Sequence, residues 1–364
     1  MKKFFGLFFV AALAASGLFL SCSDESDSMV FIPTLQDSDY TVTADADSIV
    51  ETINSMPKSG TIKTSGEFYL ILIGKVINAL KNLSYRKPNI LVTLDLSAVT
   101  GWTDLSFSSC ENLAGIVLPT SVTSISDSAF SGCYRLTSVT IPSSVTSIGD
   151  SAFRGCTKLA SVTIPSSVTS VGYTAFIDCK NLSVNYTGTL AQWCNIKFAS
   201  GDIQSYSGIP NVKFCVQGQE IKDLIIPNGV ISIGYCAFCG CAGLTSVTIP
   251  SGVTSIGSGA FCGCTRLANV MIPNSVTSID VGAFNGCERL ANVTIPSGVT
   301  KIGRSAFYNT SLQNAIFSDE NNWHCTANSD YTGGSTIDSG SLANTTTAAN
   351  YLRSTYCGNY WYKN

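Results

Sequence analysis

The chain has 364 residues, and its composition excludes several classes of protein. Charged residues make up 12% of it, about half of the usual ~25%, whereas apolar residues hold at 45%. A net charge of -3 leaves no basic excess for nucleic-acid phosphates, and a single histidine, His324, excludes a multi-histidine metal site. The polar surface is therefore expected to consist of Ser, Thr, Asn and Gly.

Residues 1–21 are expected to be a targeting segment and not part of the fold. Two lysines precede an apolar run that ends at Leu20, and Cys22 follows one small residue later, ahead of a polar run. This arrangement resembles a bacterial lipoprotein signal, which implies a lipidated Cys22 and a polar tether over residues 22–39. Because Phe19 departs from the usual leucine of that motif, a plain secretory peptide or a short membrane anchor stays open.

Most of the remaining chain is an internal repeat of 23 residues. Proline, phenylalanine and cysteine each recur at this step, and residues 136–158, LTSVTIPSSVTSIGDSAFRGCTK, form a representative copy. A degenerate copy occupies about 90–112, and the others begin at Leu113, Leu136, Leu159, Ile221, Leu244, Leu267 and Leu290. Repeats of this length indicate a solenoid.

One copy predicts a single coil of chain. Apolar residues alternate with Ser and Thr over 138–141, which is typical of a half-buried strand, and Pro142 ends that strand. After a second short extended piece, Gly149 is expected to allow a tight turn, and residues 150–153 are expected to form one helical or 3₁₀ turn. Each copy has an apolar row that it cannot bury alone, so copies must stack.

The motif LxxVxIPxxVxxIGxxAFxGCxx resembles the leucine-rich repeats of BspA-like bacterial surface proteins. The match covers residues 90–312 with one interruption. The resemblance implies a leucine-rich-repeat solenoid of parallel strands with short helical or 3₁₀ turns. It also implies a cell-surface protein of host-associated bacteria that adheres to host matrix proteins, epithelium or other bacteria. It implies no catalytic residues and no cofactor.

Three segments depart from the repeat. Residues 182–220 are too aromatic for a floppy linker, so we expect an enlarged coil with an excursion over one face. That excursion either packs against the solenoid or contacts a ligand. Residues 40–89 are expected to form an α/β cap at the amino-terminal end, and residues 313–364 an irregular aromatic cap at the other end, because open sheet edges would otherwise pair with other chains.

Fifteen cysteines are present, and half of the fourteen beyond Cys22 occupy one repeat position. A small, partly apolar side chain suits the turn before a strand, so free buried thiols are expected there, with disulfides between coils or a metal site as alternatives. The spacings of Cys236, Cys239 and Cys241 and of Cys262 and Cys264 resemble those of metal ligands only superficially, because Cys241 and Cys264 occupy the repeat position.

Cys325 and Cys357 lie outside the repeats and are a candidate disulfide. Such a bridge would close a loop of about 30 residues and hold the aromatic tail over the last coil. The alternatives are reduced thiols, with aromatic packing alone holding the tail, or pairing with Cys194 or Cys215.

The outward face of the strands is the candidate binding surface. Hydroxyl and amide groups there offer hydrogen bonds along what we expect to be one long, uncharged ramp. The residues concerned are Ser138, Thr140, Ser161, Thr163, Ser246, Thr248, Asn269, Met271, Asn292 and Thr294. A thin basic row at another repeat position is either a solvated edge or a weak site for sulfated glycans or acidic protein; it consists of Arg135, Lys158, Arg266 and Arg289.

These observations favour a non-catalytic, lipid-anchored protein of the outer membrane or cell surface that binds protein or glycan partners, such as an adhesin. The alternative is a scaffold for protein interactions that faces the periplasm. An enzyme is a remote alternative, because it would need paired carboxylates or a nucleophile–base pair on one face. His324 and Cys325 do not meet that need, since adjacent residues of an extended segment point apart. No metal, cofactor or nucleic acid is expected.

Overall fold

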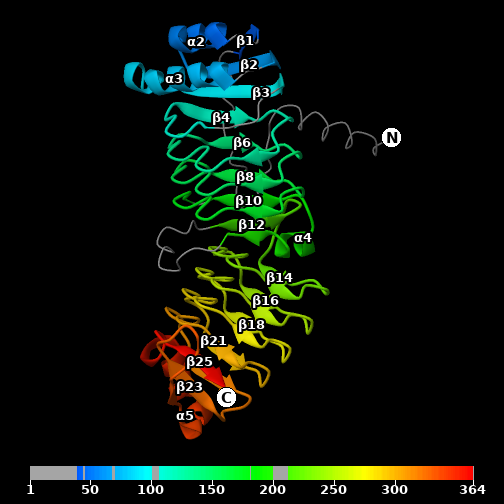
Figure 1. Cartoon of the computed structure of the whole chain (residues 1–364), viewed down its shortest axis with the longest axis vertical. Helices are drawn as coiled ribbons and strands as arrows, with labels where there is room; N and C mark the ends of the chain where they lie inside the picture. The colour runs from blue at the N-terminus through cyan, green and yellow to red at the C-terminus, as the bar shows by residue number, and fades with distance from the viewer. Residues whose placement is uncertain are drawn as a thin grey trace, which may run out of the picture.

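The chain forms an elongated solenoid whose coils stack along its long axis (Figure 1). The computed structural model describes residues 39–43, 46–67, 70–100, 106–180, 182–199 and 212–363. The proposed signal segment and Cys22 lie outside these ranges. Within them, no helix combines the length and the apolar character that crossing a membrane requires.

An α/β segment precedes the first full repeat. It comprises β1 (Asp39–Thr43), α2 (Ala46–Ser55), β2 (Gly60–Glu67), α3 (Leu70–Arg86) and β3 (Val92–Thr100). The three strands pair in parallel and continue into the sheet of the first coils. Ile53 and Leu80 are fully buried where the two helices pack together, so the segment extends the apolar core of the solenoid.

Each coil contributes a longer and a shorter strand to separate parallel ladders. The longer strands of the first coils, up to and including the start of the insertion, are β4 (Leu113–Val117), β6 (Ser138–Thr140), β8 (Ser161–Ile164) and β10 (Ser183–Tyr186). The shorter strands are β5 (Ser124–Ile125), β7 (Ser147–Ile148), β9 (Ser170–Val171) and β11 (Lys197–Phe198). Pairing is in register because equivalent residues of successive repeats face each other, as Ile125, Ile148 and Val171 do.

The same pattern resumes after the insertion. The longer strands are β14 (Asp223–Ile225), β16 (Ser246–Thr248), β18 (Asn269–Met271), β20 (Asn292–Ile295) and β22 (Asn314–Phe317). The shorter strands are β15 (Ser232–Ile233), β17 (Ser255–Ile256), β19 (Ser278–Ile279) and β21 (Lys301–Ile302). We call the coils before the insertion the proximal array and those after it the distal array.

A column of stacked phenylalanine rings runs through the core of each array. Neighbouring rings are 5.2–5.6 Å apart between centroids and nearly parallel. Backbone hydrogen bonds also join successive coils along this column. The amide of Phe153, for example, donates to the carbonyl of Ala175 in the next coil at 2.7 Å. Phe153 and Phe261 have no exposed surface, which confirms that the repeat phenylalanine points inward.

The repeat cysteine lies beside this column as a free, buried thiol. Cys156, for example, donates through Sγ to the carbonyl of Phe130 in the preceding coil at 3.1 Å, and Cys264 does the same to Phe238 at 3.2 Å. These weak hydrogen bonds join adjacent coils without a disulfide. Burial raises the pKa of the Cys110 thiol to about 12, so it stays neutral at neutral pH.

The turn after the shorter strand differs from the prediction in its local conformation. Gly149 does precede a tight turn, and glycine is required there because a Cβ would lie 2.6 Å from the amide nitrogen of Asp127 in the preceding coil. Ser151 and Gly155 have φ values of 54° and 71°. These left-handed residues interrupt the run, so the segment forms successive tight turns and not the helical or 3₁₀ turn that was expected.

The insertion forms strands that join the ladders, in addition to a part that departs from the regular coil. It contains β10, α4 (Leu190–Cys194), β11, β12 (Lys213–Val216) and β13 (Gln219–Glu220). α4 begins with a capping box formed by Thr189 and Gln192. The insertion thus adds a coil to the proximal array and ends it with an antiparallel hairpin.

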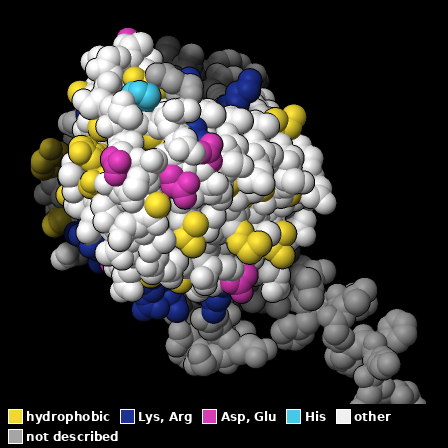
Figure 2. Space-filling view, turned by 90° about the horizontal axis from the view of Figure 1, so that it is seen from below, with side chains coloured by type: hydrophobic (Ala, Val, Ile, Leu, Met, Phe, Trp, Pro, Cys, Tyr) yellow, Lys and Arg dark blue, Asp and Glu magenta, His cyan; other side chains and the backbone are white. Residues whose placement is uncertain are grey.

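The C-terminal segment is more regular than expected. It contains β23 (Trp323–Thr326), β24 (Ser335–Thr336), α5 (Ser339–Ala343), α6 (Thr345–Asn350), a π-helical turn (Tyr351–Thr355) and β25 (Tyr360–Lys363). β25 pairs antiparallel with β21 and then with β23, so it closes the ladder of shorter strands. Seen from this end, most of the surface is backbone and uncharged polar side chains, with apolar and acidic side chains scattered among them (Figure 2).

The candidate disulfide is absent from this segment, because Cys325 and Cys357 are both free thiols. Cys325 is buried in β23 opposite Trp361, whereas Cys357 donates through Sγ to the carbonyl of Ser354 at 3.0 Å. Their backbones are thus committed to different partners. Packing of Trp323 and Trp361 against Phe317 holds the segment instead. Cys194 is also a free thiol.

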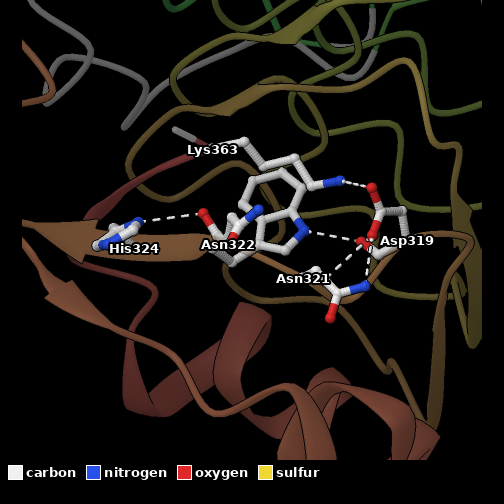
Figure 3. Close-up of polar contacts among 6 residues, drawn as sticks. Asp319, Asn321, Asn322, His324 and Lys363 are labelled. Carbon is white, nitrogen blue, oxygen red and sulfur yellow. Dashed lines mark hydrogen bonds and ion pairs between the residues drawn. The ribbon is translucent and has the colours of Figure 1, made fainter.

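A polar cluster fastens the end of β25 (Figure 3). The Lys363 ammonium pairs with the Asp319 carboxylate, which also accepts hydrogen bonds from the backbone and side-chain nitrogens of Asn321, both at 3.1 Å. Trp323 donates to the backbone carbonyl of Asp319 at 3.0 Å. The hydrogen bond from Lys363, followed by those from Asn321, lowers the pKa of Asp319 to about 2.

The phenylalanine column gives the first prediction. Phe153→Ala should lower the free energy of unfolding by about 3–5 kcal/mol, because it leaves a cavity between two stacked rings. Urea denaturation followed by circular dichroism measures this. Tyr134→Ala is the control, since that side chain is 51% exposed and its loss should change stability by less than about 0.5 kcal/mol. Equal effects of the two substitutions would contradict the assigned core.

The Asp319 cluster gives a pH-dependent prediction. The pKa of Asp319 is lowered by folding, so its contribution to stability is present above the unfolded-state pKa of about 3.9 and is lost as the pH falls toward about 2. Asp319→Asn should therefore destabilise the protein at pH 7, by no more than about 1 kcal/mol because the pair is partly exposed, and should have no effect near pH 2. Thermal melts from pH 2 to 7 measure this loss of stability in the parent protein, in Asp319→Asn, in Lys363→Met and in the double variant. A loss of stability in Asp319→Asn that is the same at every pH would contradict the ion pair.

Candidate binding surface

The ten predicted surface residues all lie on longer strands, and they alternate there with buried residues. They do not form one ramp, however. The ladder of the proximal array ends at the β12–β13 hairpin, and that of the distal array begins at β14. The four residues of the proximal group are all partly buried: Ser138, Thr140, Ser161 and Thr163. In the distal group only Ser246 is partly buried, and the others are exposed: Thr248, Asn269, Met271, Asn292 and Thr294.

The distal group belongs to a larger surface, which we call the distal sheet face. Two columns of side chains run along it from coil to coil. One column alternates apolar residues with threonine: Ile225, Thr248, Met271, Thr294 and Ile316. The other is polar: Asp223, Ser246, Asn269, Asn292 and Asn314. An apolar column thus lies next to a column of hydrogen-bonding groups over five consecutive strands.

Three of the side chains on this face are large, apolar and largely exposed. Ile225 is 68% exposed, Met271 69% and Ile316 51%. They occur at every second coil, separated by threonines. Single exposed apolar residues are ordinary on protein surfaces, but these three recur at one repeat position along the same sheet face.

The polar column is partly organised by its own contacts. The Asp223 carboxylate accepts hydrogen bonds from the hydroxyls of Ser246 at 2.6 Å and Thr245 at 2.8 Å, and these bonds lower its pKa. The amide of Asn314 donates to the side-chain oxygen of Asn292 at 3.0 Å. The face therefore carries one anionic group at its start, in contrast to the uncharged ramp that was expected.

Sequence reasoning missed the two ends of these columns. Asp223 and Ile225 stand 23 residues before Ser246 and Thr248, so the repeat step itself points to them. Ile316 follows Thr294 by 22 residues, because the last coil is one residue shorter. Extending the repeat frame by one coil in each direction would have included both ends.

Other candidate chemical groups do not converge on a site. His324 donates through Nδ1 to the carbonyl of Asn322 at 3.1 Å and stacks on Tyr362, while the neighbouring Cys325 is buried (Figure 3). Across the ranges that the structure describes, no group of three or more His, Cys, Asp or Glu side chains is arranged to hold a metal ion.

The basic row is fully solvent-facing. All four of its side chains are exposed: Arg135, Lys158, Arg266 and Arg289. The guanidinium of Arg135 donates to the carbonyl of Pro88 in the amino-terminal segment. In the view from the C-terminal end, Lys and Arg side chains gather mainly at the rim (Figure 2). Their exposure fits a solvated edge of the solenoid.

Comparison with known families identifies the repeat. A family model described as a BspA type leucine rich repeat region matches the chain in six copies, over residues 92–204 and 208–326. No curated protein shows significant similarity to the chain.

Solved structures give related but distant matches. A leucine-rich cell surface protein from Faecalibacterium prausnitzii A2-165 is 26% identical, over 77% of this chain and 83% of that one, with a TM-score of 0.46. The pneumococcal vaccine antigen PcpA is 21% identical, over 64% and 62% of the two chains, with a TM-score of 0.44. A leucine-rich repeat protein from Bacteroides ovatus ATCC 8483 is 25% identical, over 63% and 73%, with a TM-score of 0.28. Because every TM-score is below 0.5, the assignment rests on the repeat motif.

Proposed function

The chain belongs to the BspA-type leucine-rich-repeat family, and on that premise we propose that it is a non-catalytic adhesin that binds an extended partner along its distal sheet face. Members of this solenoid family are typically non-catalytic, and they are associated with the cell surface. The partner is a protein or a glycan of the host matrix, of epithelium or of other bacteria.

The observation that carries this proposal is the pairing of the two columns on the distal face. Ile225, Met271 and Ile316 are exposed at regular intervals, and amide groups such as those of Asn269 and Asn292 lie beside them. Apolar contacts supply affinity when water is displaced, while amides and hydroxyls fix the orientation of a bound chain. A series that extends over five strands suits an elongated partner better than a small molecule.

Charge plays a minor part in this recognition. Asp223 is the one ionisable group of the two columns, and it is engaged with two hydroxyls. Such a face gives little electrostatic steering, so specificity depends on the fit of many weak contacts. The basic row is the second surface of interest, as a weak attachment site for sulfated glycans or acidic protein.

Substitutions at equivalent positions of the two arrays test the proposal. Met271→Glu puts a carboxylate at the centre of the distal face, whereas Thr140→Glu puts one at the same repeat position of the proximal array. The mature chain is first tested against immobilised matrix proteins, glycans and bacterial cells to find a ligand. Met271→Glu should then weaken binding about tenfold or more, because a charge would be buried against the partner.

The control should keep affinity within about twofold, since its position lies outside the distal face. Circular dichroism verifies that both variants fold. Undiminished binding by Met271→Glu would refute the distal face as the site. So would an equal loss in Thr140→Glu, which would indicate a dependence on net charge alone.

The anchor is part of the same proposal: Cys22 is lipidated and holds the solenoid at the outer surface of the cell. Several acyl chains on one cysteine would suffice for stable attachment. Cys22→Ser should abolish palmitate incorporation and release the protein from the membrane fraction, while external protease should digest the parent protein on intact cells. Unchanged labelling of Cys22→Ser would exclude the anchor, and resistance to protease would favour the periplasmic scaffold.

A further inference from the structure

A cavity of about 180 Å³ lies where the proximal and distal arrays meet. Elsewhere, each phenylalanine ring of the column stacks on the ring of the next coil. Here the insertion separates Phe176 from Phe238, and Trp193 and Phe214 fill the interval with edge-on and tilted contacts. Rings in these orientations do not close the space as parallel rings do, so the break in the repeat leaves a cavity.

The wall of this cavity is held in place by specific contacts. The indole nitrogen of Trp193 donates to the carbonyl of Ala237 at 2.8 Å, across the boundary between the arrays. Phe214 lies 4.7 Å from Trp193 and 5.7 Å from Phe238, measured between ring centroids. Because the indole N–H is already satisfied, the ring presents its apolar surface to the cavity.

The described lining contains no charged side chain and is predominantly aliphatic and aromatic. Several of the lining residues, including Tyr173, Ile177 and Tyr235, are only partly buried. The cavity therefore reaches toward solvent on the side of the turns, which gives a ligand a way in.

Three cysteines belong to this wall. Cys236 and Cys239 line the cavity together with the repeat cysteine Cys241. Cys236 has a φ of 50°, at the left-handed position that serine holds in several other coils. Hydrogen bonds with Cys236 and Cys262 raise the pKa of Cys239 well above its usual range, and burial raises that of Cys241 to about 12. These two thiols are neutral at neutral pH and add polarisable, weakly polar surface.

We propose that this cavity is a binding site for a small, uncharged aromatic molecule, between benzene and indole in size. Volume sets the size, because an apolar cavity of roughly 150 Å³ stays dry and accepts benzene or xenon. The rings of Phe176, Trp193 and Phe214 set the class, since they offer edge and face contacts to a flat ligand. The described lining offers no charged group to pair with an ionic ligand. The site is separate from the distal sheet face and does not depend on adhesion.

Xenon is the first probe, because it binds in apolar cavities of about this size. Crystals of the mature chain under xenon pressure should show an anomalous peak bounded by Phe176, Trp193 and Phe214. A structure without xenon at that place overturns the proposal.

Ligand binding in solution is measured with benzene and indole. Either compound should raise the melting temperature with increasing concentration, as expected for a ligand that binds the folded state alone. Ile177→Trp and Val184→Phe should reduce this rise by at least about half, because both substitutions enlarge side chains that line the cavity. Two variants that fill the cavity are used so that the experiment still gives a result if one of them does not fold.

The matched control is Asn285→Trp. Asn285 follows Phe284 as Ile177 follows Phe176, and its carbonyl accepts the equivalent hydrogen bond from the preceding coil, yet it does not line the cavity. Asn285→Trp should keep the full rise in melting temperature. An equal rise in the filled variants and the control, or no rise in the parent protein, would refute the site.

Discussion

The structure depends on one constraint: no single coil can bury its own apolar row. A 23-residue coil has too little interior to enclose a phenyl ring, so Phe153 is covered only because Phe130 and Phe176 lie above and below it. The backbone is under the same constraint, since amides and carbonyls of each coil find their partners in its neighbours. Stability is consequently cooperative along the axis, and the two ends must be covered by other kinds of structure.

This constraint also separates the residues that fold the protein from those that can bind. Inward positions repeat with little change, because each must match the coils on both sides. Outward positions of the longer strands contact their neighbours only at the edge and tolerate exchange, as the alternation of Thr248, Met271 and Thr294 illustrates. The distal sheet face can thus differ from the proximal one on an almost constant scaffold. The core is uniform, and the variation between coils is concentrated in the outer columns.

The sequence was most informative where contacts repeat at a fixed step. The register of the strands, the inward phenylalanines and the free thiols such as Cys156 all follow from periodicity. It was least informative where contacts join residues that no period relates. The hydrogen bond from Trp193 to Ala237 spans 44 residues, and it helps to decide where the arrays meet.

Interpretations of short sequence patterns were also incomplete where contacts with a neighbouring coil or strand determine the structure. Gly149 indicates a tight turn, but glycine is required there because the preceding coil approaches closely, which no local pattern reveals. Cys325 and Cys357 suggest a bridge by their isolation, whereas strand pairing of β23 with β25 fixes the first of them opposite Trp361. The candidate surface was predicted in position, but its division into two faces depends on how the insertion packs.

That division has a mechanical consequence. Between β6 and β8, and again between β18 and β20, only the ladder of longer strands is interrupted, and the shorter strands carry the pairing through. At the insertion both ladders stop at the same level, with β13 and β11 on one side and β14 and β15 on the other. Among the described residues, the two arrays are therefore joined at this level by isolated contacts and not by strand pairing, as in the hydrogen bonds from Trp193 to Ala237 and from Val212 to Gly240. A force that pulls the two ends apart would act on these contacts.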